Sequence, residues 1–166
     1  MIITEILARN ARMYGSETAL IERAPAEKKR TAITWSTFDD QANRVAQALL
    51  ARGIKKDHRV VHLMMNCIEW LPIYFGILRT GAWAVPLNFR FVAKTIRRCT
   101  ETAEARAMIF GEEFIDRINT IKSELDGTVR LYIFCLLYTS DAADERGWVE
   151  VSGVGGGGMW GGGGGG

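Results

Sequence analysis

The sequence predicts an α/β domain in which helices flank a mostly parallel sheet. Along residues 1–134, short apolar runs typical of strands alternate with amphipathic patterns typical of helices, and this alternation favours a parallel sheet. Apolar residues make up 48 % of the chain, which is enough for a real core. A length of 166 residues suits one domain rather than two. The formal net charge of +2 argues against a strongly basic nucleic-acid binder, and the composition argues against a disordered or collagen-like chain.

A helix and a hairpin are predicted first. Apolar side chains at helical spacing mark a helix over roughly Thr4–Tyr14, with Gly15 as its stop. Thr18–Ile21 and Thr31–Trp35 are candidate strands. The charged segment between them, residues 22–30, is interpreted as the loop of a hairpin.

A second helix is expected after the hairpin. Ser36 is a suitable N-cap, and Asp39 follows three residues later at the spacing of a capping box. Gly53 marks the end of this helix. Five apolar residues share one face at helical spacing, which predicts that the face is buried: Phe38, Ala42, Val45, Ala46 and Leu49.

The centre of the chain is expected to hold a buried strand and a buried helix. Arg59–Met65 is apolar enough for a strand covered on both faces. Asn66 is predicted to cap the following helix, with Glu69 as its reciprocal partner. Cys67–Leu78 contains a single charge, so this helix should be central, although it is too short to span a bilayer. Pro72 is expected to kink it by removing one hydrogen bond.

The remaining predicted elements continue the alternation. A glycine at position 81 ends the central helix, and the chain then alternates strand, helix, strand, helix and strand. The last strand ends where the composition changes. These elements cover Ala82–Val85, Val92–Thr102, Arg106–Phe110, Phe114–Leu125 and Val129–Phe134.

The composition breaks near Phe134, which divides the chain into residues 1–134 and 135–166. The first part carries 20 basic and 15 acidic side chains, and the second carries 1 basic and 4 acidic ones. From position 153 onward, 11 of 14 residues are glycine, so this tail is expected to be disordered. The string Leu137–Glu145 resembles translated sequencing-adapter read-through, and the glycines resemble a run of G base calls. We therefore expect residues 135–166 to be non-native or disordered.

The glycine tail also matches the spacing of a dinucleotide-binding loop. Gly153, Gly155 and Gly158 fit the pattern G-x-G-x-x-G, and Trp148–Val151 could be the strand before it. The pattern requires a helix after the glycines, whose N-terminus would hold the pyrophosphate. More glycine follows instead, so the pattern favours a flexible linker over a dinucleotide-dependent oxidoreductase.

Several residues in the first part are candidate site residues. His58 and His62 lie four residues apart, but they stand in a strand-like run without a third ligand, which argues against a metal site. Asp57 and His58 are adjacent and would point to opposite faces of a strand, which argues against an acid–base pair. The cysteines are too few and too scattered for a zinc site or a disulfide framework, and Cys67 has apolar neighbours that favour inert packing. A basic patch could contact coenzyme A phosphates or form a solvated helix face: Arg90, Lys94, Arg97 and Arg98. The tryptophans are interpreted as core or interface residues: Trp35, Trp70 and Trp83.

The stretch from Thr34 to Phe110 carries a series of short motifs. They are Thr34-Trp-Ser-Thr-Phe38, Asn43-Arg-Val-Ala46, Leu49-Leu-Ala-Arg-Gly53-Ile, Arg59-Val-Val61, Asn66-x-x-Glu69-Trp, Tyr74-Phe-Gly-Ile-Leu78 and Gly81-Ala-Trp-Ala-Val-Pro86-Leu-Asn88. Their order and spacing resemble the N-terminal subdomain of the AMP-forming acyl-CoA synthetases, which are adenylate-forming ligases. One departure is Asp57, because the turn at this position usually contains glycine in that family. An aspartate there is strained if the turn requires a positive φ.

The resemblance implies an intact enzyme that joins a fatty or related carboxylic acid to coenzyme A through an acyl-adenylate, using ATP and Mg²⁺. Such enzymes hold the ATP phosphates with a Ser/Thr/Gly-rich loop that ends in lysine, and residues 1–134 contain no such loop. Tyr138-Thr-Ser140 matches its start, but acidic residues follow. We therefore expect an inactive N-terminal fragment with no catalytic, cofactor-binding or metal-binding residue of its own.

The expected partners are the acid substrate and the missing remainder of the chain, with no nucleic acid and no membrane span. The N-terminus lacks the pattern of a signal peptide, so a cytoplasmic location is expected. One alternative stays open, which is a free-standing small α/β interaction module with a flexible tail.

Overall fold

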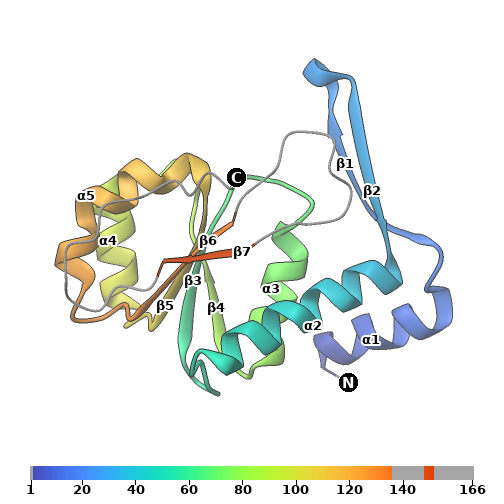
Figure 1. Cartoon of the computed structure of the whole chain (residues 1–166), viewed down its shortest axis with the longest axis horizontal. Coiled ribbons are helices and arrows are strands. Elements are labelled where there is room, and N and C mark those ends of the chain that lie inside the picture. Colours follow the sequence, from blue (N-terminus) through green and yellow to red (C-terminus); the bar gives the residue numbers. More distant parts are fainter. Residues whose placement is uncertain (1, 136–147, 152–166) are drawn as a thin grey trace, which may run out of the picture.

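The computed structural model describes residues 2–135 and 148–151, and it has a layered α/β architecture (Figure 1). One sheet has the strand order β4-β3-β5-β6-β7. The first four strands are parallel, and β7 pairs with β6 in the antiparallel direction. Helices α4 and α5 lie on one side of this sheet, and α2 and α3 lie on the other (Figure 1). The predicted fold class is therefore confirmed.

The first helix and the hairpin form as predicted, with longer strands. Helix α1 spans Ile3–Tyr14, and strands β1 (Thr18–Ala24) and β2 (Lys29–Thr34) pair in the antiparallel direction. The turn between them is a short 3-10 helix, η1 (Pro25–Glu27). The hairpin extends away from the rest of the chain (Figure 1).

Helix α2 spans Trp35–Ala51 and begins two residues earlier than a cap at Ser36 would place it. Thr34, rather than Ser36, is the N-cap, because its hydroxyl oxygen accepts a hydrogen bond from the N–H of Thr37 at 3.2 Å. The predicted apolar face is buried as a whole. Gly53 follows the helix with a φ of 82°, and the N–H groups of Gly53 and Ile54 donate to the carbonyls of Leu50 and Leu49, which is the Schellman arrangement.

Strand β3 spans Arg59–Leu63, and helix α3 spans Trp70–Arg79. The predicted cap at Asn66 is wrong, because residues 67–69 form a turn and the helix begins three residues later. Pro72 therefore lies in the first helical turn, where an N–H has no partner within the helix, so the proline removes no hydrogen bond. No residue of α3 is exposed, which confirms that the helix is central.

The rest of the described chain follows the predicted alternation within one or two residues. The elements are β4 (Trp83–Pro86), α4 (Ala93–Thr102), β5 (Ala107–Gly111), the short 3-10 helix η2 (Glu112–Phe114), α5 (Ile115–Leu125), β6 (Leu131–Cys135) and β7 (Trp148–Val151). The strand expected before the glycine tail is β7. The adapter-like string and the glycine tract lie outside the described residues.

Two apolar clusters cover the two faces of the sheet. Val60, Ile73 and Ile77 belong to the cluster between the sheet and helices α2 and α3. Val61, Ile96 and Ile118 belong to the cluster between the sheet and helices α4 and α5. Neighbouring residues of β3 thus point to opposite faces, as a strand covered on both sides requires. Within the described residues, no helix is long and apolar enough to cross a membrane.

Candidate functional site

The topology of the sheet nominates one crevice, at the carboxyl ends of β3 and β5. These strands are neighbours, but the chain leaves β3 toward α3 on one face and leaves β5 toward α5 on the other. In open parallel sheets, ligands bind where the connections diverge in this way. The candidate site is therefore formed by residues 64–69 after β3 and by residues 111–114, which are the last residue of β5 and the segment after it.

Glu113 bridges the two sides of this crevice. Its Oε1 accepts a hydrogen bond from the backbone N–H of Met65 at 3.3 Å. Gly111 makes room for this side chain, since an added β-carbon would lie 2.5 Å from Oε2 of Glu113. The sequence analysis did not identify Glu113, because the contact joins residues that are distant along the chain.

The charges along this edge do not suit a nucleotide triphosphate. The described segments after β3, β4 and β5 carry three carboxylates, at Glu69, Glu112 and Glu113. Two cations lie at this edge: Arg90, over the ring of Phe89, and Arg117 of α5, which donates to the carbonyl oxygens of Phe89 and Phe91. A triphosphate requires cationic groups and N–H donors, and it would be repelled by these carboxylates. The described residues therefore do not fit an ATP and Mg²⁺ site by themselves.

The two histidines have separate structural environments. Nδ1 of His58 accepts a hydrogen bond from the N–H of Lys55 at 3.1 Å, in the turn before β3. His62 is completely buried, both ring nitrogens lack a hydrogen-bond partner, and its ring centroid lies 4.7 Å from that of Trp70. Burial lowers the pKa of His62 to about 4. Among the described residues, no group of three or more side chains could hold a metal ion.

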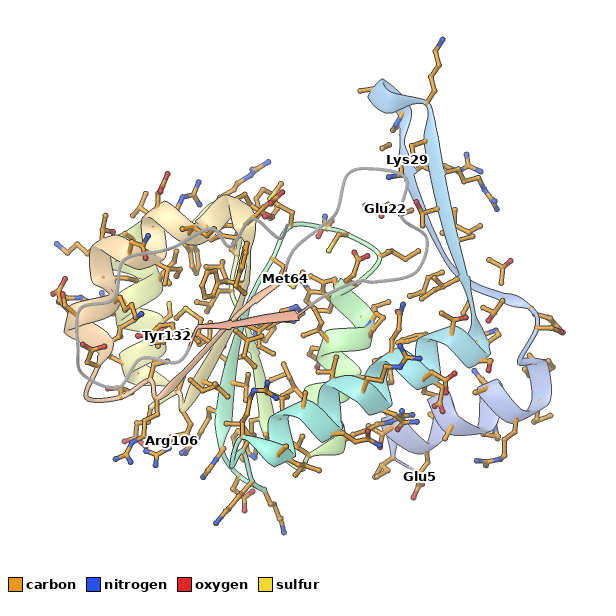
Figure 2. The ribbon with its side chains drawn as sticks, in the orientation of Figure 1. Glu5, Glu22, Lys29, Met64, Arg106 and Tyr132 are labelled. Carbon is orange, nitrogen blue, oxygen red and sulfur yellow. The ribbon has the colours of Figure 1, made fainter. Side chains whose placement is uncertain are left out.

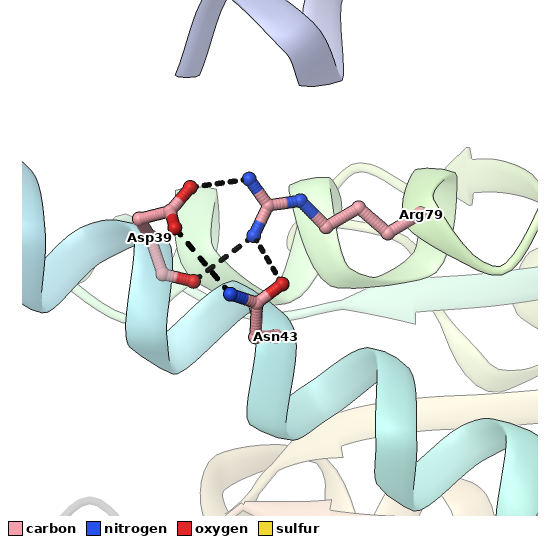
Figure 3. Close-up of polar contacts among 3 residues, drawn as sticks. All are labelled: Asp39, Asn43 and Arg79. Carbon is pink, nitrogen blue, oxygen red and sulfur yellow. Dashed lines mark hydrogen bonds and ion pairs between the residues drawn. The ribbon is translucent and has the colours of Figure 1, made fainter. Parts of the chain in front are cut away.

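A polar cluster of three residues joins α2 to α3 (Figure 3). The guanidinium of Arg79 donates to the carboxylate of Asp39, to the carbonyl oxygen of Asp39 at 3.0 Å and to Oδ1 of Asn43 at 2.7 Å. The side chains of Arg79 and Asp39 are 12 % and 19 % exposed, so this is a largely buried ion pair. Asp39 was predicted to belong to a capping box; the structure instead places it in this interhelical contact.

The predicted basic patch is partly neutralised. Arg97 forms ion pairs with Glu101 and Glu124, which favours the interpretation of the patch as a solvated helix face. Cys67 is half-buried and packs against the apolar cluster under α3. Trp35 and Trp70 make ring contacts with Phe38 and Tyr74, whereas Trp83 is 60 % exposed and is not a core residue.

Asp57 has a φ of 65°, so the turn before β3 does require the left-handed conformation. The N–H of His58 donates to the carbonyl of Lys55 at 3.1 Å, which closes a four-residue turn with Asp57 at its third position. Aspartate tolerates this conformation better than most residues, but glycine adopts it without strain. The strain expected from the sequence at this position is therefore present.

Comparison with known proteins identifies the family. Residues 7–151 match the family described as AMP-binding enzyme. The long-chain-fatty-acid–CoA ligase FadD13 of Mycobacterium tuberculosis is 33 % identical over 103 residues, which are 61 % of this chain and 20 % of that protein. A 3-hydroxybenzoate/4-hydroxybenzoate–CoA ligase of Thauera aromatica is 33 % identical over 123 residues, which are 74 % of this chain and 22 % of that protein.

Solved structures agree with this assignment. The N-terminal domain of FACL13 from Mycobacterium tuberculosis superposes on this chain with a TM-score of 0.71 at 30 % identity. The matched region covers 80 % of this chain and 33 % of the FACL13 chain. The chain thus spans about a fifth to a quarter of the length of the curated relatives it matches. It belongs to the family of AMP-binding, adenylate-forming acyl-CoA ligases.

Proposed function

We propose that the chain supplies the opening structural segment of an ATP-dependent acyl-CoA ligase. The intact enzyme would join a fatty or related carboxylic acid to coenzyme A, with ATP and Mg²⁺, in the cytoplasm. The observation that carries this proposal is the match of 80 % of the chain to the N-terminal domain of a fatty acyl-CoA ligase at 30 % identity. The proposed partner of the chain is the remainder of such a ligase.

The proposed role of the chain is scaffolding. Its parallel strands and central helix α3 would form part of the layers behind the acyl and nucleotide sites, which other segments of the ligase would complete. We also propose that the chain alone cannot form an acyl-adenylate. The support is the charge at the carboxyl edge, where the described carboxylates of Glu69, Glu112 and Glu113 outnumber the two arginines, Arg90 and Arg117, and would repel a triphosphate.

A chimera tests the scaffolding role. Residues 2–134 would replace the matching segment of the Mycobacterium tuberculosis ligase FadD13, and acyl-CoA formation would be measured. We expect the chimera to retain activity, because the segment would restore the same sheet and helices. A matched chimera carrying Gly76→Val should lose activity together with folding, since α3 could then no longer pack on α2. A folded chimera without activity would contradict the proposal.

A second experiment tests the proposed inactivity of the chain alone. The purified 166-residue protein would be assayed for ATP–pyrophosphate exchange in the presence of fatty acids of several lengths. We expect no exchange above that of a heat-denatured sample. Robust exchange would overturn the proposal. If the isolated chain is a monodisperse monomer with a cooperative melting transition, the alternative of a free-standing interaction module is favoured.

That residues 135–166 are a non-native or disordered segment remains a prediction. Resequencing of the source DNA through codon 134 is the direct test. A reading frame that continues into a Ser/Thr/Gly-rich loop ending in lysine would support the ligase proposal. A confirmed glycine tract followed by a stop codon would contradict it.

A further inference from the structure

Three arginines occupy one row across the amino edge of the parallel sheet. The register pairs Val60 with Ala107 and Ala107 with Leu131, so the residues before them are also neighbours: Arg59, Arg106 and Arg130. Backbone hydrogen bonds confirm the row, since Arg106 N–H donates to Arg59 O at 2.8 Å and Arg130 N–H donates to Arg106 O at 3.0 Å. Figure 2 shows Arg106 at this edge of the sheet.

The three arginines lie side by side at the amino edge of the sheet. Arg59 is the first residue of β3, and Arg106 and Arg130 stand directly before β5 and β6. The backbone hydrogen bonds between them continue the spacing of the strands, so their backbones lie about 4.8 Å apart.

Little negative charge balances this row. A carboxylate oxygen of Glu104 lies 3.6 Å from a guanidinium nitrogen of Arg59; the side chain of Glu104 is 76 % exposed and that of Arg59 is 41 % exposed. Within the described part of the chain, neither Arg106 nor Arg130 has a carboxylate at ion-pair distance. Like charges directly opposite each other on neighbouring strands destabilise a sheet. The carboxyl ends of α4 and α5 offset part of this repulsion through their dipoles, and a bound anion would offset more.

An exposed aromatic residue extends the row by one strand. Trp83 pairs with Arg59 in the register of β4 and β3, and the guanidinium carbon of Arg59 lies 5.7 Å from the centre of the indole ring. Trp83 is 60 % exposed, although it lies in a strand. The row therefore reads Trp-Arg-Arg-Arg across β4, β3, β5 and β6.

We propose that this row is a binding surface for a small oligophosphate, either free or as the phosphate tail of a nucleotide. The planar guanidinium group binds phosphate oxygens in pairs, which makes arginine better suited to this role than lysine. The three arginines span about 10 Å at the spacing of neighbouring strands, which matches a di- or triphosphate better than an extended anionic surface. An indole at the end of the row offers a stacking surface for a nucleobase.

The proposed surface is separate from the crevice described above. Arg59 begins β3 and Leu63 ends it, so the two edges of the sheet are about 13 Å apart along that strand. Met64 and Arg106 mark the two edges in Figure 2. A ligand on the arginine row would therefore not occupy the carboxyl edge of β3 and β5.

Calorimetric titration of the full chain with inorganic tripolyphosphate at low ionic strength tests the proposal. The double variant Arg106→Gln/Arg130→Gln should bind at least about tenfold more weakly, since each arginine contributes a charged hydrogen bond. Arg23→Gln/Arg30→Gln is the matched control. These two arginines also face each other across neighbouring strands, in the hairpin, and the variant removes the same amount of charge. The control should bind tripolyphosphate as the wild type does.

A variant that keeps the charge separates binding from folding. Arg106→Lys/Arg130→Lys should fold and should bind tripolyphosphate more tightly than the glutamine double variant, though more weakly than the wild type. If the two arginines only stabilise the ends of α4 and α5, their replacement should leave tripolyphosphate binding unchanged. Trp83→Phe should remove the change in tryptophan fluorescence that accompanies binding. Absence of measurable binding by the wild type, or equal loss in both glutamine double variants, would overturn the proposal.

Titrations with ATP and with sulfate distinguish between the possible ligands. Tighter binding of ATP than of tripolyphosphate, dependent on Trp83, would assign the phosphate tail of a nucleotide as the ligand. Equal affinity for the two would assign a free oligophosphate. Sulfate that binds as tightly as tripolyphosphate would overturn the proposal, because it would show general anion binding without recognition of a phosphate chain.

Discussion

Gly76 lies where α3 meets α2, and its replacement by alanine tests how tightly the two helices pack. A β-carbon added to Gly76 would lie 2.5 Å from Cβ and Cγ1 of Val45 and 3.0 Å from the carbonyl oxygen of Ala42. Favourable contacts between carbon atoms lie at about 3.5–4.0 Å, so the helices would have to separate by about 1 Å. Glycine in a helix interior is unfavourable, and this close approach explains why it is needed here.

The expected magnitude follows from two opposing effects. Overpacking of a core costs about 1–3 kcal/mol, and the contact with the backbone of Ala42 places Gly76→Ala at the upper end. Alanine recovers about 1 kcal/mol of helix propensity relative to glycine. We therefore expect Gly76→Ala to lower the free energy of unfolding by about 2 kcal/mol.

Urea unfolding followed by circular dichroism is the assay. Gly127→Ala is the matched control, because nothing lies within 4 Å of a β-carbon added there, and its stability should be unchanged or higher. Val45→Ala should cost less in the Gly76→Ala background than in the wild type, by about 0.5 kcal/mol or more, because the two positions are in contact. If Gly76→Ala unfolds at the same or a higher urea concentration than the wild type, with an unchanged m value, the reasoning is refuted.

Three further predictions concern charge and backbone conformation. The pKa of His62 is lowered to about 4 in the folded state, so the unfolded state binds the proton more readily and stability falls as the pH drops from about 6.5 toward 4; between pH 7.5 and 5 the loss is about 2 kcal/mol. Urea unfolding of His62→Leu at both pH values should show a smaller loss, and an unchanged pH dependence would contradict the assignment. Asp57→Gly should raise the free energy of unfolding by about 0.5 kcal/mol and Asp57→Ala should lower it, because the φ of 65° favours glycine. Asp39→Ala should cost about 2 kcal/mol by leaving Arg79 without its carboxylate at the interface of α2 and α3, whereas Glu124→Ala at an exposed pair should cost less than about 1 kcal/mol; equal thermal shifts for the two variants would contradict this difference.

The functional features that the sequence did not reveal all depend on residues brought together from distant segments. Arg79 and Asp39 are forty residues apart along the chain, and Glu113 reaches Met65 across 48 residues. The arginine row exists because the register between strands places its members side by side, and register is a property of tertiary pairing. The sequence analysis placed Asp39 in a helix cap and placed Arg59 and Arg106 at the starts of strands, and it gave no role to Arg79, Glu113 or Arg130.

The sequence by itself determined the order of the helices and strands and the buried face of α2. Apolar periodicity and a glycine such as Gly53 are local signals, and burial against neighbours reinforces them. The start of α2 was decided by tertiary structure, because both Thr34 and Ser36 can cap a helix. The N–H of Trp35 donates to Glu17 O and the N–H of Ser36 donates to Gly15 O, so the segment between α1 and β1 fixes both groups and leaves Thr34 as the cap. Hydrogen bonds between distant segments thus chose between two local possibilities that have similar free energies in isolation.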